Sequence, residues 1–182
     1  MEKAIDLRIV KKALITLGFI AASILLPQIF HVFGLNGQKF LPMHIPVLLA
    51  GLLLGPSYGL VAGMISPLVS TALTGMPAEF PMMPIMVFEL GTYGLISGIL
   101  SKYTKLPKAV SLIIAMLAGR VSYFIAYEII KVAFLPTIGA NISVWGAVIT
   151  GIPGIIIQLI IINLVMLILR RKKEGLEEGL HE

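Results

Sequence analysis

The amino-acid sequence predicts an all-α membrane protein, a bundle of six transmembrane helices with both termini in the cytoplasm. Hydrophobic residues make up 58% of its 182 residues, charged residues only 13%, and the mean hydropathy is +1.00. A soluble domain carries about one quarter charged residues, so this much apolar surface calls for lipid around it. The apolar residues also form long runs that glycine, proline and charged residues separate, which is typical of membrane spans.

The first two helices differ in length. The run Ile9–Val32 is long enough to cross a bilayer and too long for the core of a signal peptide, so we expect it to stay in the mature protein. A loop over Gly34–Lys39 follows it. The second helix, His44–Leu54, begins near Pro42 and Pro46, and it is too short to cross without neighbouring helices. It forms either one arm of a broken hairpin or a partly re-entrant segment with the helix that follows.

Turns and loops set off the remaining four helices. The turn Gly55-Pro56-Ser57 precedes the third helix, and the proline-rich loop Thr74–Pro81 precedes the fourth. The last two helices are separated by a predicted loop over Pro136–Ser143. The four segments are Tyr58–Leu73, Met82–Ser101, Pro107–Leu135 and Val144–Leu169. We therefore divide the chain into a six-helix transmembrane domain over residues 1–170 and a charged, partly disordered cytoplasmic tail over residues 171–182.

The placement of positive charge predicts the orientation. Eleven of the fourteen basic residues fall in three clusters: Lys3, Arg8, Lys11 and Lys12; Lys102, Lys105 and Lys108; and Arg170, Arg171, Lys172 and Lys173. If all six segments cross, the three clusters lie on the same side, which the excess of positive charge identifies as the cytoplasm. The net charge of +5 is therefore typical of membrane topology rather than of nucleic-acid binding.

Motifs for catalysis are absent from the sequence. The chain has no cysteine, no G-x-x-x-x-G-K-[ST] phosphate loop and no H-E-x-x-H zinc motif. Its three histidines, His31, His44 and His181, are not placed for a Ser-His pair. We expect no catalytic residues, no metal ligands and no cofactor.

Polar residues inside the later spans are the candidates for a binding site, because ionisable groups in a membrane usually face the bundle interior or a pathway. Glu89 and Tyr93 share a face of the fourth helix at i, i+4 spacing. In the fifth helix, at ~100° per residue, one stripe contains Arg120, Tyr123, Tyr127 and Lys131, with Glu128 at its margin. Gln158 and Asn163 are the polar residues of the sixth helix. Together these side chains are expected to line a cavity that opens to the outer side.

Structural roles compete with that interpretation. Glu128 and Lys131 form an i, i+3 pair near a helix end, which is as typical of a structural ion pair as of a site. His44 fits a helix cap or an interfacial residue at least as well as a ligand contact, and Trp145 fits an interfacial anchor. For Glu89 and Arg120 we favour a role in the pocket.

A family resemblance extends over most of the chain. The run Leu41-Pro-Met-His-Ile-Pro-Val-Leu-Leu-Ala-Gly-Leu-Leu-Leu-Gly-Pro56 resembles the substrate-binding S components of energy-coupling factor (ECF) vitamin transporters. The resemblance continues through Tyr58-Gly59, Gly63, Ser66-Pro67, Thr74-Gly75-Met76-Pro77 and Glu89-Leu90. It implies a multi-pass subunit of a prokaryotic plasma membrane, not itself an enzyme, that captures a vitamin outside the cell. A membrane-embedded coupling protein and two cytoplasmic ATPases then drive import.

The resemblance also implies which residues contact the solute and the partner. Residues 39–44 would belong to a gating loop, and the substrate-binding candidates are Lys39, His44, Glu89, Tyr93, Arg120, Tyr123, Tyr127, Gln158 and Asn163. Gly18 and Ala22 match the small-xxx-small spacing with which the first helix of such proteins packs on the coupling protein. Riboflavin, pantothenate and cobalamin all stay open as substrates. An autonomous secondary carrier or channel is the main alternative, and a membrane enzyme or assembly factor is a third.

Overall fold

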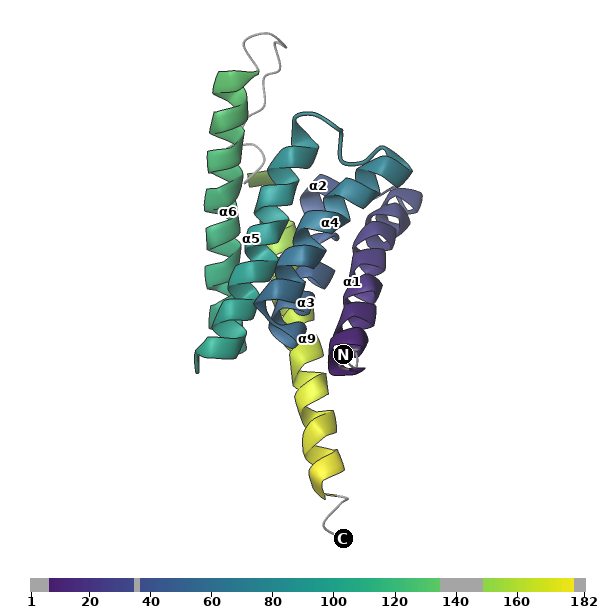
Figure 1. Cartoon of the computed structure of the whole chain (residues 1–182), viewed down its shortest axis with the longest axis vertical. Coiled ribbons are helices and arrows are strands. Elements are labelled where there is room, and N and C mark those ends of the chain that lie inside the picture. Colours follow the sequence, from purple (N-terminus) through teal and green to yellow (C-terminus); the bar gives the residue numbers. More distant parts are fainter. Residues whose placement is uncertain (1–6, 35–36, 135–148, 179–182) are drawn as a thin grey trace, which may run out of the picture.

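A computed structural model describes residues 7–34, 37–134 and 149–178, and every regular element in these ranges is a helix (Figure 1). In chain order the helices are α1 (Leu7–Val32), α2 (Gly37–Phe40), α3 (His44–Leu54), α4 (Pro56–Thr74), α5 (Met82–Tyr103), α6 (Lys108–Ala133) and α9 (Ile152–Glu178). Five of them, α1, α4, α5, α6 and α9, are long and apolar enough to cross a membrane, and α3 is a shorter apolar helix. The all-helical membrane fold predicted from the sequence is thereby confirmed.

The observed bounds match the predicted ones closely over the first five predicted helices, and two differences lie elsewhere in the chain. The predicted loop after the first helix contains the single turn of α2. The start of the last predicted helix, its preceding loop and Trp145 lie outside the described residues. That helix also does not end at Leu169, because α9 continues to Glu178. Lysine and glutamate are good helix formers, so charge alone does not end a helix.

The short helix α3 lies inside the bundle. It packs against α4 and α5 and also contacts α1 and α9. Seven of its eleven residues are buried, among them Val47 and Leu48, which have no exposed surface. Protein rather than lipid therefore surrounds α3, and its backbone needs no full bilayer-length span to be shielded.

Glycines let α4 and α5 touch through their backbones. A Cβ atom on Gly94 of α5 would overlap the carbonyl group of Gly59 of α4 and lie 2.9 Å from the Gly59 Cα. A Cβ on Gly63 would overlap the Leu90 carbonyl in the same way. Such close approach favours helix association in membranes, where burial of apolar surface supplies little driving force.

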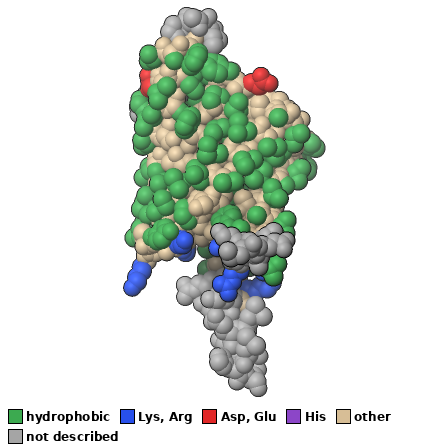
Figure 2. Space-filling model, in the orientation of Figure 1, with side chains coloured by type: hydrophobic (Ala, Val, Ile, Leu, Met, Phe, Trp, Pro, Cys, Tyr) green, Lys and Arg blue, Asp and Glu red, His purple; other side chains and the backbone are tan. Residues whose placement is uncertain are grey.

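Charge and hydropathy divide the surface along the long axis. The start of α1, the junction between α5 and α6 and the C-terminal end of α9 lie at one end of the bundle (Figure 1). Lys and Arg side chains gather at this end, and apolar side chains cover the flank above it (Figure 2). On α6 the exposed apolar residues include Leu117, Val121 and Ile125. This is the surface expected for a helix that faces lipid.

Candidate functional site

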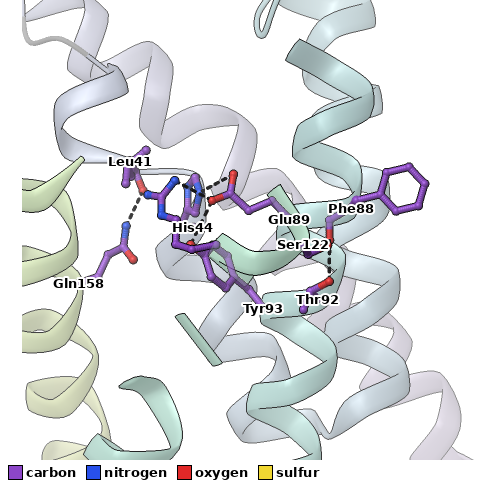
Figure 3. A network of polar contacts seen from close by, with 9 residues as sticks. Leu41, His44, Phe88, Glu89, Thr92, Tyr93, Ser122 and Gln158 are labelled. Carbon is purple, nitrogen blue, oxygen red and sulfur yellow. Dashed lines mark hydrogen bonds and ion pairs between the residues drawn. The ribbon is translucent and has the colours of Figure 1, made fainter. Parts of the chain in front are cut away.

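Glu89 is the centre of a buried polar cluster that joins three helices. Its carboxylate on α5 is 2% exposed and lies 2.8 Å from Nη1 of Arg120 on α6. The hydroxyl of Tyr93, one turn along α5, donates to Oε1 of Glu89 at 3.1 Å. Nε2 of His44 on α3 lies 3.8 Å from Oε2. We call these four residues the Glu89 cluster; Figure 3 shows His44 and Tyr93 beside the Glu89 carboxylate.

The segment before α3 holds His44 in this position. The carbonyl of Leu41 accepts a hydrogen bond from the backbone N–H of His44 at 3.1 Å and from Nε2 of Gln158 on α9 at 3.3 Å (Figure 3). Leu41 adopts a positive φ of 49°, a conformation uncommon for residues other than glycine. The imidazole of His44 also packs against the Tyr93 ring, with centroids 5.3 Å apart.

Contacts between α5 and α6 fix Tyr93 and Arg120. A Cβ atom on Gly119 would overlap ring atoms of Tyr93 and stand 2.9 Å from its Cζ, so only glycine leaves space for this ring. Beside the ion pair, Ser122 on α6 donates to the Phe88 carbonyl on α5 at 3.2 Å (Figure 3). The two helices are therefore tied together on either side of Glu89.

Several polar atoms around the cluster have no hydrogen-bond partner among the described residues. They are both ring nitrogens of His44, Nε and Nη2 of Arg120, and the hydroxyl of Tyr123. His44 is 1% exposed, Tyr123 is 3% exposed and the Arg120 side chain is 14% exposed. Buried polar atoms are almost always paired, so unpaired ones concentrated at one place need an explanation.

An apolar wall adjoins these atoms. Tyr123 packs in a cluster of buried side chains from α5 and α6, made of Ile85, Tyr123, Ala126, Tyr127 and Ile130, with Met82 against it. The wall shares the face of α6 that carries Arg120. A few orienting polar groups on an otherwise apolar surface are the usual composition of a small-molecule site.

The structure brings together five of the nine predicted substrate-binding residues, namely His44, Glu89, Tyr93, Arg120 and Tyr123. Gln158 reaches this group through Leu41, and Tyr127 lines the wall. Asn163 instead donates to the Leu159 carbonyl of its own helix at 2.8 Å, and Lys39 is exposed on α2.

The end of the predicted α6 stripe lies outside the cluster. Lys131 pairs with Glu128 at 3.6 Å, and these side chains are 51% and 38% exposed. This geometry fits the structural interpretation of the pair. On α1, Gly18 is exposed, with nothing within 4 Å of an added Cβ, and Ala22 is half-buried. Their assignment to a partner surface stays a prediction.

Comparison with known proteins decides the family. Residues 12–166 match the family model described as "ECF transporter, substrate-specific component". The chain belongs to this family. No curated protein and no solved structure matched the sequence.

Family membership confirms the resemblance found in the sequence. This S component is a membrane-embedded, substrate-specific subunit of an ECF transporter, so it is a transport subunit and not an enzyme. Membership implies a small-molecule substrate, a membrane coupling protein and ATPases as partners. Together with the five long apolar helices it supports a multi-pass protein of the plasma membrane.

Proposed function

We propose that this S component captures a water-soluble vitamin of the riboflavin, pantothenate or cobalamin class, outside the cell, beside the Glu89 cluster. Both termini and the basic end of the bundle then face the cytoplasm of a prokaryotic cell. ATP hydrolysis on the two partner ATPases drives release inward through the coupling protein.

The observation that supports this site is the set of unpaired polar atoms around a buried ion pair. An ion pair that only holds helices together would be expected to satisfy its remaining donors, because burial of unpaired polar groups is costly. Here Oε1 of Glu89 has two partners, Arg120 and Tyr93, whereas Arg120, Tyr123 and His44 keep polar atoms without partners among the described residues. A solute that supplies those hydrogen-bond partners would offset the free-energy cost of burying these polar groups.

Depth in the bundle agrees with access from the outer side. Glu89 is the eighth residue of α5, so it lies roughly 10 Å along the helix from Met82. Met82 is at the end of α5 opposite to Lys102 and the other basic residues. With the basic end in the cytoplasm, the cluster is therefore nearer to the outside.

Binding and transport measured separately test this function. The chain purified alone should bind one vitamin in calorimetry, yet transport it in liposomes only when the coupling protein and both ATPases are present with ATP. Transport by the chain alone, driven by an ion gradient, would contradict the proposal and favour a secondary carrier. Mass spectrometry of small molecules retained through purification would name the vitamin.

The location of the site has its own test. Arg120→Ala should weaken vitamin binding, because it removes the orienting guanidinium. The variant should be less stable, because Glu89 loses its counter-charge, but should remain a folded bundle. Lys131→Ala is the matched control, since it removes a cation of the same helix whose side chain is half exposed and paired with Glu128. Equal affinities of the wild type and the Arg120 variant would remove Arg120 from the site.

A further inference from the structure

The guanidinium of Arg120 has one complete edge that meets no partner among the described residues. Nη1 is the nitrogen that contacts Oε1 of Glu89, at 2.8 Å. Nε and Nη2 are buried and meet no acceptor in the described parts of the chain. In a guanidinium these two nitrogens form one edge, and their N–H bonds point in parallel. Such an edge matches the two oxygens of a carboxylate or a phosphate.

A further hydrogen-bond donor, the hydroxyl of Tyr123, lies one turn beyond Arg120 on the same helix. Tyr123 follows Arg120 at i, i+3, so both side chains project from one face of α6. Its hydroxyl is buried and has no partner among the described residues. A phenol donates readily to an anionic oxygen. The Arg120 edge and the Tyr123 hydroxyl together offer three donors to one acceptor group.

Glu89 has a different task from these donors. Its Oε1 accepts from both Arg120 and Tyr93, and its Oε2 faces Nε2 of His44. Glu89 thus holds the guanidinium through Nη1 and leaves the Nε–Nη2 edge without a partner among the described residues. Glu89 is therefore a positioning residue rather than a contact of the solute.

The two parallel donors of the Arg120 edge favour a solute with an oxyanion over one with a neutral carbonyl. A neutral carbonyl presents a single oxygen and would leave part of the buried edge poorly paired, which carries a desolvation cost. An oxyanion fills both positions of the edge and adds charge to each hydrogen bond. The imidazole nitrogen Nδ1 of His44 remains for a neighbouring hydroxyl or N–H of the solute, because a neutral imidazole nitrogen accepts.

We infer that the solute carries an oxyanion, a carboxylate or a phosphate ester, which the Nε–Nη2 edge of Arg120 binds in a bidentate manner with Tyr123 as the third donor. This inference rests on the proposed function, because it takes the Glu89 cluster as the place where the solute binds. It narrows the substrate class to acids and sets neutral vitamins aside.

The first experiment identifies the solute that the full-length protein retains. Protein extracted in mild detergent is denatured, and the released small molecules are analysed by mass spectrometry. A carboxylic acid or phosphate ester supports the inference, and a neutral solute overturns it while leaving the proposed function standing. If no solute is retained and neither cobalamin nor any of the probes in the next experiment binds, the proposed function itself fails.

The second experiment compares matched acid and neutral probes by calorimetry: pantothenate with pantothenol, nicotinate with nicotinamide, and riboflavin 5′-phosphate with riboflavin. Within the pair that the protein binds, the acid should bind more tightly than its neutral partner by a factor on the order of 10 to 100. The first two pairs report a carboxylate, and the third reports a phosphate. Equal affinity within the binding pair, or a preference for the neutral member, would overturn the inference.

Arg120→Lys tests whether the acid is recognised by the two parallel N–H donors of the guanidinium or by its positive charge alone. Lysine keeps a cation next to Glu89 and so protects the fold, but it lacks the two parallel donors. The variant should lose most of the preference for the acid while its melting temperature stays near that of the wild type. Lys131→Gln, which removes an exposed cation of the same helix, is the control and should keep the preference. A preference that survives in Arg120→Lys would show that the acid is recognised elsewhere.

Discussion

Replacing Gly119 by alanine adds a single methyl group at the contact between α5 and α6. The new Cβ would overlap Cε1 and Cδ1 of Tyr93 and stand 2.9 Å from Cζ, whereas carbon atoms normally approach to about 3.5 Å. The ring has little free space around it, because Tyr93 is 1% exposed and packs against the imidazole of His44. Either the ring moves, which breaks its hydrogen bond to Glu89, or α6 moves away and takes Arg120 with it.

The cost of Gly119→Ala follows from these two responses. Overpacking of a buried contact typically destabilises a protein by about 1 to 3 kcal/mol, and loss of the Tyr93–Glu89 hydrogen bond adds about 1 kcal/mol. Thermal unfolding in detergent should show the loss as a lower melting temperature, and calorimetry should show weaker solute binding. Gly18→Ala is the control for stability, because a Cβ there meets nothing within 4 Å.

A double-mutant cycle makes the prediction specific to one contact. In a Tyr93→Leu background the smaller side chain leaves room for the methyl group, so Gly119→Ala should cost less there than in the wild type. A Gly119→Ala variant that melts at the wild-type temperature and binds with wild-type affinity would refute the reasoning, as would equal costs in the two backgrounds.

Three further substitutions test other parts of the structure. Glu89→Gln should lower stability by about 3 to 5 kcal/mol, because it leaves Arg120 buried without its counter-charge; the double variant with Arg120→Gln should melt at a higher temperature than the single one, and the reverse order would contradict this account. Gly94→Ala should prevent α4 and α5 from packing, since its Cβ would overlap the Gly59 carbonyl, and a wild-type elution profile in size-exclusion chromatography would argue against such a contact. Gly18→Leu should spare solute binding but reduce co-purification with the coupling protein, and an intact complex would exclude that surface.

Most of the helical plan could be predicted because lipid imposes a simple requirement on the sequence. Runs of apolar residues ended by glycine, proline or charge gave five helices close to their observed positions. The single turn of α2 was missed because four residues carry no periodic signal. The extension of α9 past Leu169 was missed because a charged segment was interpreted as a tail, although its residues are compatible with a helix.

The site was predictable along each helix but not between helices. The ~100° rotation per residue placed Arg120 and Tyr123 on one face of α6, and i, i+4 spacing paired Glu89 with Tyr93. That His44 would meet Glu89 depends on which face α3 turns towards α5, and no periodicity within α3 reveals this. The same applies to Gly119, whose role depends on the Tyr93 ring of another helix. Lys131 projects in the same direction around α6 as Arg120 and Tyr123, but it lies near the end of the helix, where its side chain reaches the surface.

The backbone contact between α4 and α5 also bears on how a solute can enter and leave. With carbonyl groups of one helix seated against glycines of the other, these helices cannot slide or rotate past each other without collision. Together with the enclosed α3 they form a stiff frame that carries Glu89, Tyr93 and His44. We therefore expect this frame to keep its shape while a solute enters, so that these three side chains stand in their places before binding.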